Sequence, residues 1–416
     1  MRGVKAPAAW HDRRVSSDVL VIGGGIAGLT FAAEAARTGR SVLLVEKSAE
    51  LGGCLATRPA RDGFWIELGA HTCYNSYGTF LALLDGLGLL GELQARGKPV
   101  LRFLDGDGIL PGKNLGALLR RMNPLRAALA LPMAAFSRPN GKTVRQYYGG
   151  LVGANNYARA LGPMLAAVPC QPADDFPADM LFKKRARRKD VMRSFTLRRG
   201  LGSVAAAVAA LPGVTARTGV AAAALERAGG RFVATLDDGS RAEARLVALA
   251  VPPAAAAGLL GGVAPDAAAA AAKIGAAAVD SVGAVVAAEK CPLPYATFFI
   301  PVGDGFYSIV TRDVVPHPSL RGFAFHFKPG AAPAERLARV CKVLRVDRKD
   351  LVDVWEKRSV LPSPVLGHHA TVAAFDAALA PDIAAAGNWF AGLSIEDCVS
   401  RARAEWRRLA GLTDPA

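Results

Sequence analysis

The stretch DVLVIGGGIAG, residues 18–28, decides the fold. Its first five residues form an apolar run typical of a buried strand, and residues 29–37 predict a helix. Gly23, Gly25 and Gly28 stand between the two in the spacing Gly-x-Gly-x-x-Gly. Gly23 permits a tight turn, Gly25 lets a pyrophosphate approach the backbone, and Gly28 lets the helix pack closely on the strand. The N–H groups at the start of the helix would bind the anion.

A second strand is predicted at 41–45 and ends at Glu46. An acid at the end of this strand accepts hydrogen bonds from ribose hydroxyls, which suits NAD or the adenosine half of FAD and disfavours NADP. The glycines and the acid together predict a Rossmann-like dinucleotide-binding domain in an α/β protein.

Composition excludes several other classes of protein. The chain has 416 residues, of which 51% are hydrophobic, so it is neither disordered nor collagen-like, and its length suggests two or three domains. Its six cysteines include no C-x-x-C pair, which argues against a zinc site and against a secreted disulfide framework. We expect no bound metal and a reducing, cytoplasmic location.

The formal net charge is +16, and its densest run is residues 183–189. We interpret this run as a solvated segment beside Asp174, Asp175 and Asp179, because charge runs usually lie on the surface. No helix-turn-helix, zinc finger or aromatic RNA-binding pattern accompanies it, so nucleic acid is not an expected partner.

Membrane contact is left open by the sequence. Residues 1–14 have no signal-peptide core, and the longest apolar span, 246–264, is interrupted by Pro252 and Pro253, so no transmembrane helix is expected. The basic residues of 120–126 precede an apolar stretch at 127–136. This pairing fits either an interfacial anchor, peripheral at the inner face of a membrane, or a helix packed on the protein.

Three further segments carry a family resemblance: KSAELGGCLAT (47–57), GFWIELGAH (63–71) and AGNWFAGLSIEDC (386–398). They resemble the flavin-dependent amine oxidase superfamily, and are most similar to protoporphyrinogen oxidases and phytoene desaturase-like FAD oxidoreductases. The resemblance implies a Gly-Gly pair after the ribose acid, a glycine turn near the flavin ring, and a last helix capped by Ser394 and aimed at the flavin. It also implies a return to the FAD domain at 195–201, followed by a strand at 214–220.

The resemblance and the glycine motif together give the expected FAD contacts: Gly23, Gly25, Ile26, Ala27, Gly28, Glu46, Lys47, Gly52, Gly53, Gly69, Ala70, His71, Val220, Gly392, Ser394 and Ile395. Cys54 stands where many members have an arginine, and no covalent-attachment run is visible, so the FAD is expected to be non-covalent. His71 is the candidate catalytic residue, although a packed, hydrogen-bonded histidine fits its position equally well. His368 and His369 are interpreted as structural.

The order of these segments predicts a Rossmann-like FAD-binding domain with a discontinuous α+β substrate-binding (cap) domain. The FAD-binding domain would comprise 15–80, 195–260 and 360–412, and the cap 81–194 and 261–359. A hairpin at 232–240 and a strand at 246–251 belong to the first. A helix at 155–168 and antiparallel strands at 282–289, 295–301, 305–312 and 322–328 belong to the second, where the strands would form the floor of a substrate cavity.

The function that the resemblance implies is removal of hydride from a hydrophobic, acid-bearing small molecule, with oxygen or a quinone as electron acceptor. Arg145, Arg312, Lys328 and Arg358 are the candidates to bind the acid groups of the substrate. The alternatives are a flavin amine oxidase, a polyene desaturase or isomerase, and an FAD-binding scaffold without catalysis.

Overall fold

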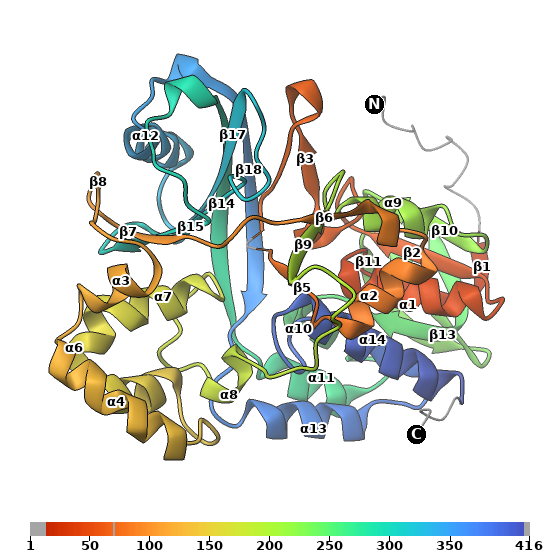
Figure 1. Cartoon of the computed structure of the whole chain (residues 1–416). Helices are drawn as coiled ribbons and strands as arrows, with labels where there is room; N and C mark the ends of the chain where they lie inside the picture. Colours follow the sequence, from red (N-terminus) through yellow and green to blue (C-terminus); the bar gives the residue numbers. More distant parts are fainter. Residues whose placement is uncertain (1–13, 70, 412–416) are drawn as a thin grey trace.

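The computed structural model describes residues 14–69 and 71–411 and contains two seven-stranded sheets (Figure 1). The first has the strand order β10-β2-β1-β13-β12-β11, and β19 pairs with the last part of β13. Its strands are β1 (Arg14–Ile22), β2 (Val42–Glu46), β10 (Val214–Thr218), β11 (Ala222–Ala228), β12 (Arg231–Leu236), β13 (Arg241–Leu249) and β19 (Ile383–Ala385). All of its pairings are parallel except the meander of β11, β12 and β13.

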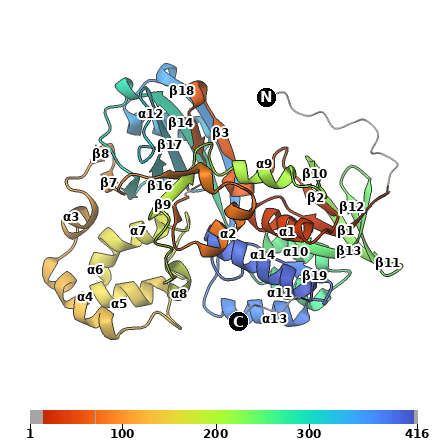
Figure 2. The ribbon, with the colours of Figure 1, turned by 45° about the vertical axis from the view of Figure 1, so that its right-hand side comes forward.

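Helices cover both faces of this first sheet. Val19 and Val21 point to one face and Leu20 and Ile22 to the other, which is why the central strands are apolar throughout. The first face carries α1 (Ile26–Arg37), α2 (Gly78–Gly86), α9 (Ser203–Ala209) and α14 (Ile395–Leu409). The second face carries α10 (Pro253–Leu260), α11 (Pro265–Ala272) and α13 (His368–Ala378). Helices α1, α2 and α14 lie side by side (Figure 2).

These elements confirm the predicted Rossmann-like arrangement and the predicted α/β class. Helix α1 begins directly after the glycine turn, and β1 pairs with β2 in parallel register. The predicted hairpin is formed by β12 and β13, where Gly239 takes a left-handed φ of +84° in the turn.

The second sheet has the order β18-β14-β17-β16-β15-β7-β8. Its strands are β7 (Leu101–Asp105), β8 (Gly108–Ile109), β14 (Ala276–Ala287), β15 (Phe298–Val302), β16 (Phe306–Thr311), β17 (Leu320–Phe327) and β18 (Leu351–Pro362). The four predicted strands of the cap are present as β14, β15, β16 and β17, and their pairings with one another are antiparallel. The pairing of β15 with β7 is parallel. The sequence did not predict β7, β8 or β18.

The second sheet has one face packed on α12 (Pro333–Leu344) and the other on residues 64–68. Glycines make the second contact possible. A Cβ on Gly283 would lie 2.4 Å from the side chain of Leu68, and one on Gly322 would lie 2.4 Å from that of Ile66. Two small sheets connect the halves: β3 (Thr57–Pro59) with β4 (Trp65–Glu67), and β5 (Cys73–Tyr74), β9 (Ser194–Leu197) and β6 (Leu93–Ala95).

A helical lobe lies against the second sheet, at the lower left of Figure 1. It contains α3 (Asn114–Leu119), α4 (Pro124–Phe136), α5 (Gly150–Val152), α6 (Ala154–Asn156), α7 (Gly162–Ala167) and α8 (Ala178–Leu181). The helix predicted at 155–168 corresponds to α6 and α7 joined by a π-helical turn at Tyr157–Leu161.

The two large sheets fit the predicted two-domain arrangement. Helix α11 packs on the first sheet although the predicted division assigns its residues to the cap, and the domain boundaries stay a prediction. No helix in the described part of the chain is long and apolar enough to cross a bilayer.

Candidate functional site

The glycine turn between β1 and α1 has the geometry that its sequence predicts. Gly23 has a φ of +106°, and a Cβ on Gly28 would lie 1.9 Å from the carbonyl oxygen of Gly23. A Cβ on Gly25, by contrast, would have no described protein atom within 4 Å, and Gly25 is the N-cap residue of α1. The site therefore offers open space at a helix N-terminus, where an anion is favoured.

Glu46 closes this turn from the end of β2. Its carboxylate accepts hydrogen bonds from the backbone N–H groups of Gly24 at 2.7 Å and Ser48 at 2.8 Å, and its side chain is buried. Two bonds leave lone pairs on the carboxylate for a ribose. The buried Val220 lies beside it, since its N–H donates to the carbonyl of Glu46.

The Gly-Gly pair packs on the glycine turn. Gly52 N–H donates to the carbonyl of Gly24 at 2.8 Å, and a Cβ on Gly53 would lie 3.1 Å from the Cα of Gly25. Both glycines take positive φ. Lys357 of β18 donates to the carbonyl of Gly53 at 2.5 Å, which ties the second sheet to this loop. The predicted contact Lys47 is exposed, and Ile26 and Ala27 form the first turn of α1.

The N-terminus of α14 is capped as predicted. The Ser394 hydroxyl accepts a hydrogen bond from the backbone N–H of Asp397 at 3.1 Å. Ile395 is buried in the core below, and a Cβ on Gly392 would lie 2.7 Å from the Asp397 carboxylate.

The basic run 183–189 lies in a loop of mostly exposed residues, which fits the interpretation of a solvated segment. The acid that two of its cations contact is Asp397 of this helix and not one of Asp174, Asp175 and Asp179. Lys183 and Arg185 both pair with Asp397, at 2.9 and 2.8 Å. Lys183 also donates to the carbonyl of Ala391.

The loop after β4 brings Gly69 and His71 together, and Ala70 lies outside the described residues. The Nε2 atom of His71 lies 2.8 Å from the carbonyl oxygen of Cys54, and a Cβ on Gly69 would lie 2.3 Å from that Nε2. Burial lowers the pKa of His71, so its imidazole is neutral at pH 7. The contact with Cys54 is that of a packed histidine, and a catalytic role of His71 stays a prediction.

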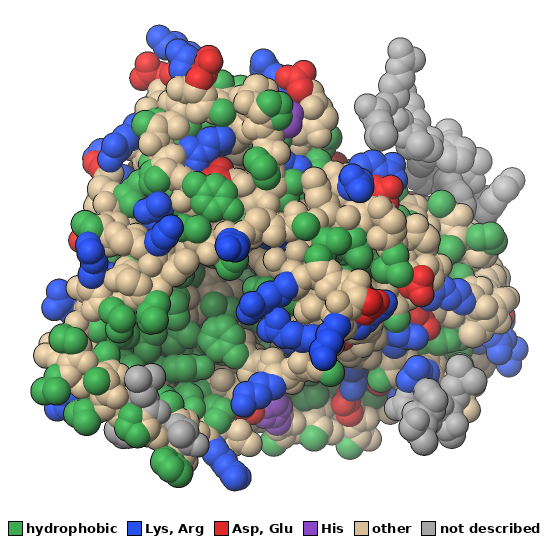
Figure 3. Space-filling model, viewed as in Figure 1, with side chains coloured by type: hydrophobic (Ala, Val, Ile, Leu, Met, Phe, Trp, Pro, Cys, Tyr) green, Lys and Arg blue, Asp and Glu red, His purple; other side chains and the backbone are tan. Residues whose placement is uncertain are grey.

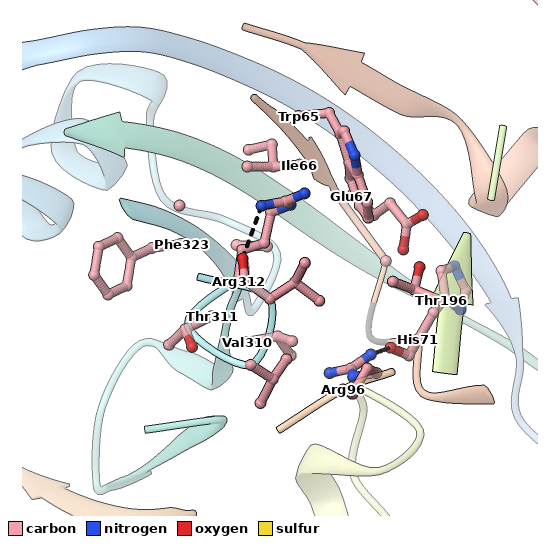
Figure 4. Close-up of a pocket in the computed structure, with 15 residues that line it drawn as sticks. Trp65, Ile66, Glu67, His71, Arg96, Thr196, Val310, Thr311, Arg312 and Phe323 are labelled. Carbon is pink, nitrogen blue, oxygen red and sulfur yellow. Dashed lines mark hydrogen bonds between the residues drawn. The ribbon is translucent and has the colours of Figure 1, made fainter. Parts of the chain in front are cut away.

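A cavity of about 40 Å³ lies beside this loop, between β4, β9, β16 and β17 (Figure 4). Its apolar wall includes Trp65, Ile66, Val310 and Phe323. Its polar side chains are Glu67, His71, Arg96, Thr196, Thr311 and Arg312.

The charged groups of the cavity are perturbed by their burial. The Glu67 carboxylate accepts a hydrogen bond from the backbone N–H of Leu201 at 2.7 Å, and burial raises its pKa to about 7. Burial lowers the pKa of Arg312 to about 10, and its guanidinium lies over the rings of Trp65 and Phe64, at 4.0 and 4.6 Å from their centroids. Arg96 donates to the carbonyl of His71 at 2.5 Å.

Of the four cations predicted to bind substrate, Arg312 alone lines this cavity. Arg145 pairs with Asp174 in the helical lobe, Lys328 donates to the carbonyl of Asp304, and Arg358 is exposed beside Asp280. Whether these three bind substrate stays a prediction.

Sequence reasoning did not assign roles to Glu67, Arg96, Thr196 or Lys357. Glu67 and Thr196 stood in segments of the family resemblance without a role, and Arg96 lies in a segment with no recognisable pattern. The buried His326 was likewise uninterpreted. Its Nδ1 lies 3.0 Å from the Ser308 hydroxyl and its Nε2 3.2 Å from the carbonyl oxygen of Leu68, and burial lowers its pKa to about 4.

A hollow lined with hydrophobic side chains opens on the face drawn in Figure 3, between the helical lobe and the second sheet, and Lys and Arg side chains border it. Among the described residues no cluster of three His, Cys, Asp or Glu could hold a metal ion. His368 is buried with its Nε2 2.7 Å from the carbonyl oxygen of Trp389, and His369 pairs with Asp179.

Known proteins resemble the chain in two ways. A model of the NAD(P)-binding Rossmann-like domain family matches residues 21–87. The 15-cis-phytoene desaturase of Narcissus pseudonarcissus is 36% identical over 77 residues, which cover 18% of this chain and 14% of the desaturase. The sequence match thus includes only a small part of that relative's length.

The likeness to solved structures extends over nearly the whole chain. A putative protoporphyrinogen oxidase from Exiguobacterium sp. 255-15 superposes with a TM-score of 0.76 at 19% identity, covering 95% of this chain and 99% of that one. Wild-type putrescine oxidase bound to putrescine gives a TM-score of 0.66 at 17% identity, covering 96% and 100%. At these identities the likeness shows the fold. This fold is the one that the predicted resemblance implies.

Proposed function

We propose that the chain is an FAD-dependent oxidoreductase that takes hydride from a hydrophobic, acid-bearing substrate. The assignment of FAD as cofactor rests on the open space at Gly25, which lies at the N-terminus of α1 and beside the Glu46 carboxylate. A pyrophosphate fits the first position and a ribose the second. The superfamily fold supports FAD as the dinucleotide.

Bound FAD would supply the redox step by accepting a hydride from the substrate. The residues of this chain would hold and shield it. Gly25 and the first turn of α1 would bind the pyrophosphate, and Glu46 would accept from the ribose hydroxyls. The N-terminus of α14 would favour negative charge nearby, because the helix dipole is positive there.

The substrate half of the proposal rests on two features. The hydrophobic hollow of Figure 3 suits an apolar molecule, and the cations at its border suit an acidic one. The cavity beside His71 carries the two guanidinium groups of Arg96 and Arg312, a charge that disfavours a cationic amine. Oxygen or a quinone would accept the electrons.

An anaerobic spectrum of the purified protein tests this function. We expect a yellow protein whose flavin absorbance is bleached by protoporphyrinogen and stays unchanged with a panel of small amines. Bleaching by amines alone would move the function to an amine oxidase, and bleaching by a polyene alone would move it to a desaturase. A colourless protein that does not take up added FAD would contradict the cofactor assignment.

We also propose that the helical lobe contacts an anionic membrane surface. Between residues 108 and 173 the chain has eight Lys and Arg and no Asp or Glu, which is half of the net charge of +16. Large apolar side chains of α3 and α4 are exposed in the same lobe: Leu115 64%, Leu125 72%, Leu129 55% and Phe136 90%. Exposed apolar side chains among cations are what an interfacial helix needs. The cytoplasmic leaflet carries anionic lipid, which fits the predicted location.

Sedimentation with vesicles tests this contact. We expect binding to vesicles that contain phosphatidylserine and weaker binding to neutral vesicles or in high salt. The double substitution Leu125→Ser and Leu129→Ser should abolish binding. The matched control, Val354→Ser with Val360→Ser on exposed positions of β18, should leave binding unchanged. Equal loss in both variants, or no binding by the unsubstituted protein, would contradict the proposal.

A further inference from the structure

The cavity beside His71 has more positive charge than its surroundings neutralise. Arg96 and Arg312 line it, and no ion pair is present for either guanidinium within the described residues. Each makes one hydrogen bond to a backbone carbonyl, Arg96 to His71 and Arg312 to Val315 at 2.9 Å. A guanidinium has five N–H donors, so most of these donors have no protein acceptor.

Two buried polar atoms at the same cavity also have no protein partner. The Thr196 side chain is 3% exposed and its Oγ1 makes no hydrogen bond, although it lines the cavity between Glu67 and His71 in Figure 4. The Nε atom of Arg312 is buried and unpaired in the same way. Leaving such groups unpaired destabilises the folded protein, and a bound acceptor would relieve this.

Glu67 does not cancel this charge. Its carboxylate already accepts from the Leu201 N–H, and it carries at most one negative charge against two guanidinium groups. His71 is neutral, and the remaining lining residues carry no charge. The cavity therefore has a net positive charge whether or not Glu67 is protonated. Both guanidinium groups are partly exposed, and the Nε atom of Arg312 is buried. Charges with little access to water are normally paired, so an anion would complete the site.

We propose that this cavity binds a carboxylate-sized oxyanion through Arg96, Arg312 and Thr196. Its volume of about 40 Å³ admits a group of a few heavy atoms and excludes a whole macrocycle. The planar fork of a guanidinium matches the two oxygens of a carboxylate. The stacking of Arg312 on Trp65 and Phe64 fixes that fork in place.

The oxyanion has two possible sources, a free small carboxylate or the acid group of the substrate. The second source rests on the proposed function, whereas the binding site itself does not. Binding is measured without turnover, so loss of the proposed oxidoreductase activity would not affect the result.

Calorimetric titration of the purified protein with sodium acetate tests the site, with sodium chloride at equal ionic strength as the reference. We expect acetate to bind and to raise the Tm, and chloride to do so at least tenfold more weakly. Arg312→Met should weaken acetate binding at least tenfold, while Lys273→Met, an exposed position that loses the same charge, should change it less than twofold. Absence of acetate binding, an equal response to chloride, or unchanged binding by Arg312→Met would overturn the proposal.

A second variant distinguishes loss of acetate binding from loss of folding. Thr196→Val removes the unpaired hydroxyl and keeps the side-chain shape. We expect the Tm of the ligand-free variant to stay equal or rise, and its acetate affinity to fall severalfold. A merely structural hydroxyl would give the opposite pair of results, a lower Tm and unchanged affinity.

Competition identifies the source of the oxyanion. Protoporphyrin and its dimethyl ester are titrated with and without saturating acetate. If acetate weakens binding of the acid and not of the ester, the site takes the acid group of the substrate. If acetate binds and affects neither, the site holds a free small carboxylate. Both results support the oxyanion site, and they assign different occupants.

Discussion

At the scale of single residues, the dinucleotide turn separates glycines needed for folding from one available for binding. Gly28 is closely covered by the backbone of Gly23, whereas Gly25 faces open space at a φ of −75° that any residue adopts. Two substitutions of the same size should therefore have different effects, although the glycines belong to one motif.

Gly25→Val should purify as a folded protein, with a free energy of unfolding within about 0.5 kcal/mol of the unsubstituted chain measured without cofactor. Its FAD content should fall more than tenfold, because the side chain would occupy the place of the pyrophosphate. Gly28→Val should instead lose about 3 kcal/mol or more, since the added atoms overlap backbone. Denaturant titration with flavin absorbance checks both. Full FAD content in Gly25→Val would contradict the placement of the cofactor.

Glu67 should make stability depend on pH. Its folded pKa of about 7 lies above the ordinary value of 4.5, so the folded state keeps a proton that the unfolded state loses. The facing charged groups Arg96 and Arg312 oppose this shift but do not outweigh burial. The contribution of the protonated Glu67 to the free energy of unfolding is therefore complete below pH 4.5. Up to about 3 kcal/mol of it is lost as the pH rises through about 7.

The variant Glu67→Gln isolates this effect, because its amide oxygen still accepts from Leu201 and does not titrate. Its stability relative to the unsubstituted protein should increase between pH 5 and pH 8 in urea titrations. The opposing titration of His326, whose lowered pKa costs stability as pH falls, is common to both proteins and cancels in the comparison. A difference in stability between the two proteins that does not change with pH would contradict the raised pKa of Glu67.

At the scale of elements, the helices and strands with the strongest local sequence patterns were the ones predicted correctly. The apolar strands and glycine turn of β1, α1 and β2 are specified by neighbours in sequence, as is the Ser394 cap of α14. The cavity could not be predicted in this way, because Glu67, Arg96 and Arg312 come together only when β4, the segment after β6 and the segment after β16 pack. Strand β18 was missed because its alternating exposed residues carry charge as well as apolar side chains.

The loop of residues 182–193 illustrates the same limit for charge patterns. Nothing in the run of cations indicates that two of them pair with Asp397, a residue distant in sequence. The pairing also places the loop beside the N-terminus of α14.

Asp397→Asn should release this loop from α14. We expect trypsin to cleave between residues 183 and 189 at least severalfold faster than in the unsubstituted protein, since cleavage follows the open population. Asp190→Asn, which removes the exposed partner of Arg188 in the same loop, is the matched control and should change the rate little. Equal cleavage of both variants would contradict a role for Asp397 in holding the loop.

At the scale of the whole molecule, the proposed cofactor joins elements that are distant in the chain. Its expected contacts come from α1, β2, the Gly-Gly loop, the 69–71 loop and the start of α14. A ligand that binds the folded state alone stabilises it by an amount set by its concentration and Kd.

Removal of FAD should therefore lower the Tm of the whole chain, and its return should restore it. At a hundredfold excess over the Kd, the gain is about 2.7 kcal/mol. Differential scanning calorimetry of stripped and reconstituted protein measures it. NADP, whose 2′-phosphate meets the Glu46 carboxylate, serves as the reference and should give no comparable gain. Equal stabilisation by NADP would contradict the role of Glu46.

The paired strands β14 and β18 have a consequence for how the molecule can vary. Ala276 pairs with Pro362, and Ser363 N–H donates to the carbonyl of Gly275 at 2.8 Å, so the chain leaves and re-enters the first sheet's helical layer at adjacent points. The segment between them behaves topologically as an insertion with touching ends. Such a segment can be lengthened, recombined or exchanged between homologues without changing the path of the chain through the part that carries the glycine turn. Two features must be kept: the pairing of this segment with β7, and the close contacts at Gly283 and Gly322.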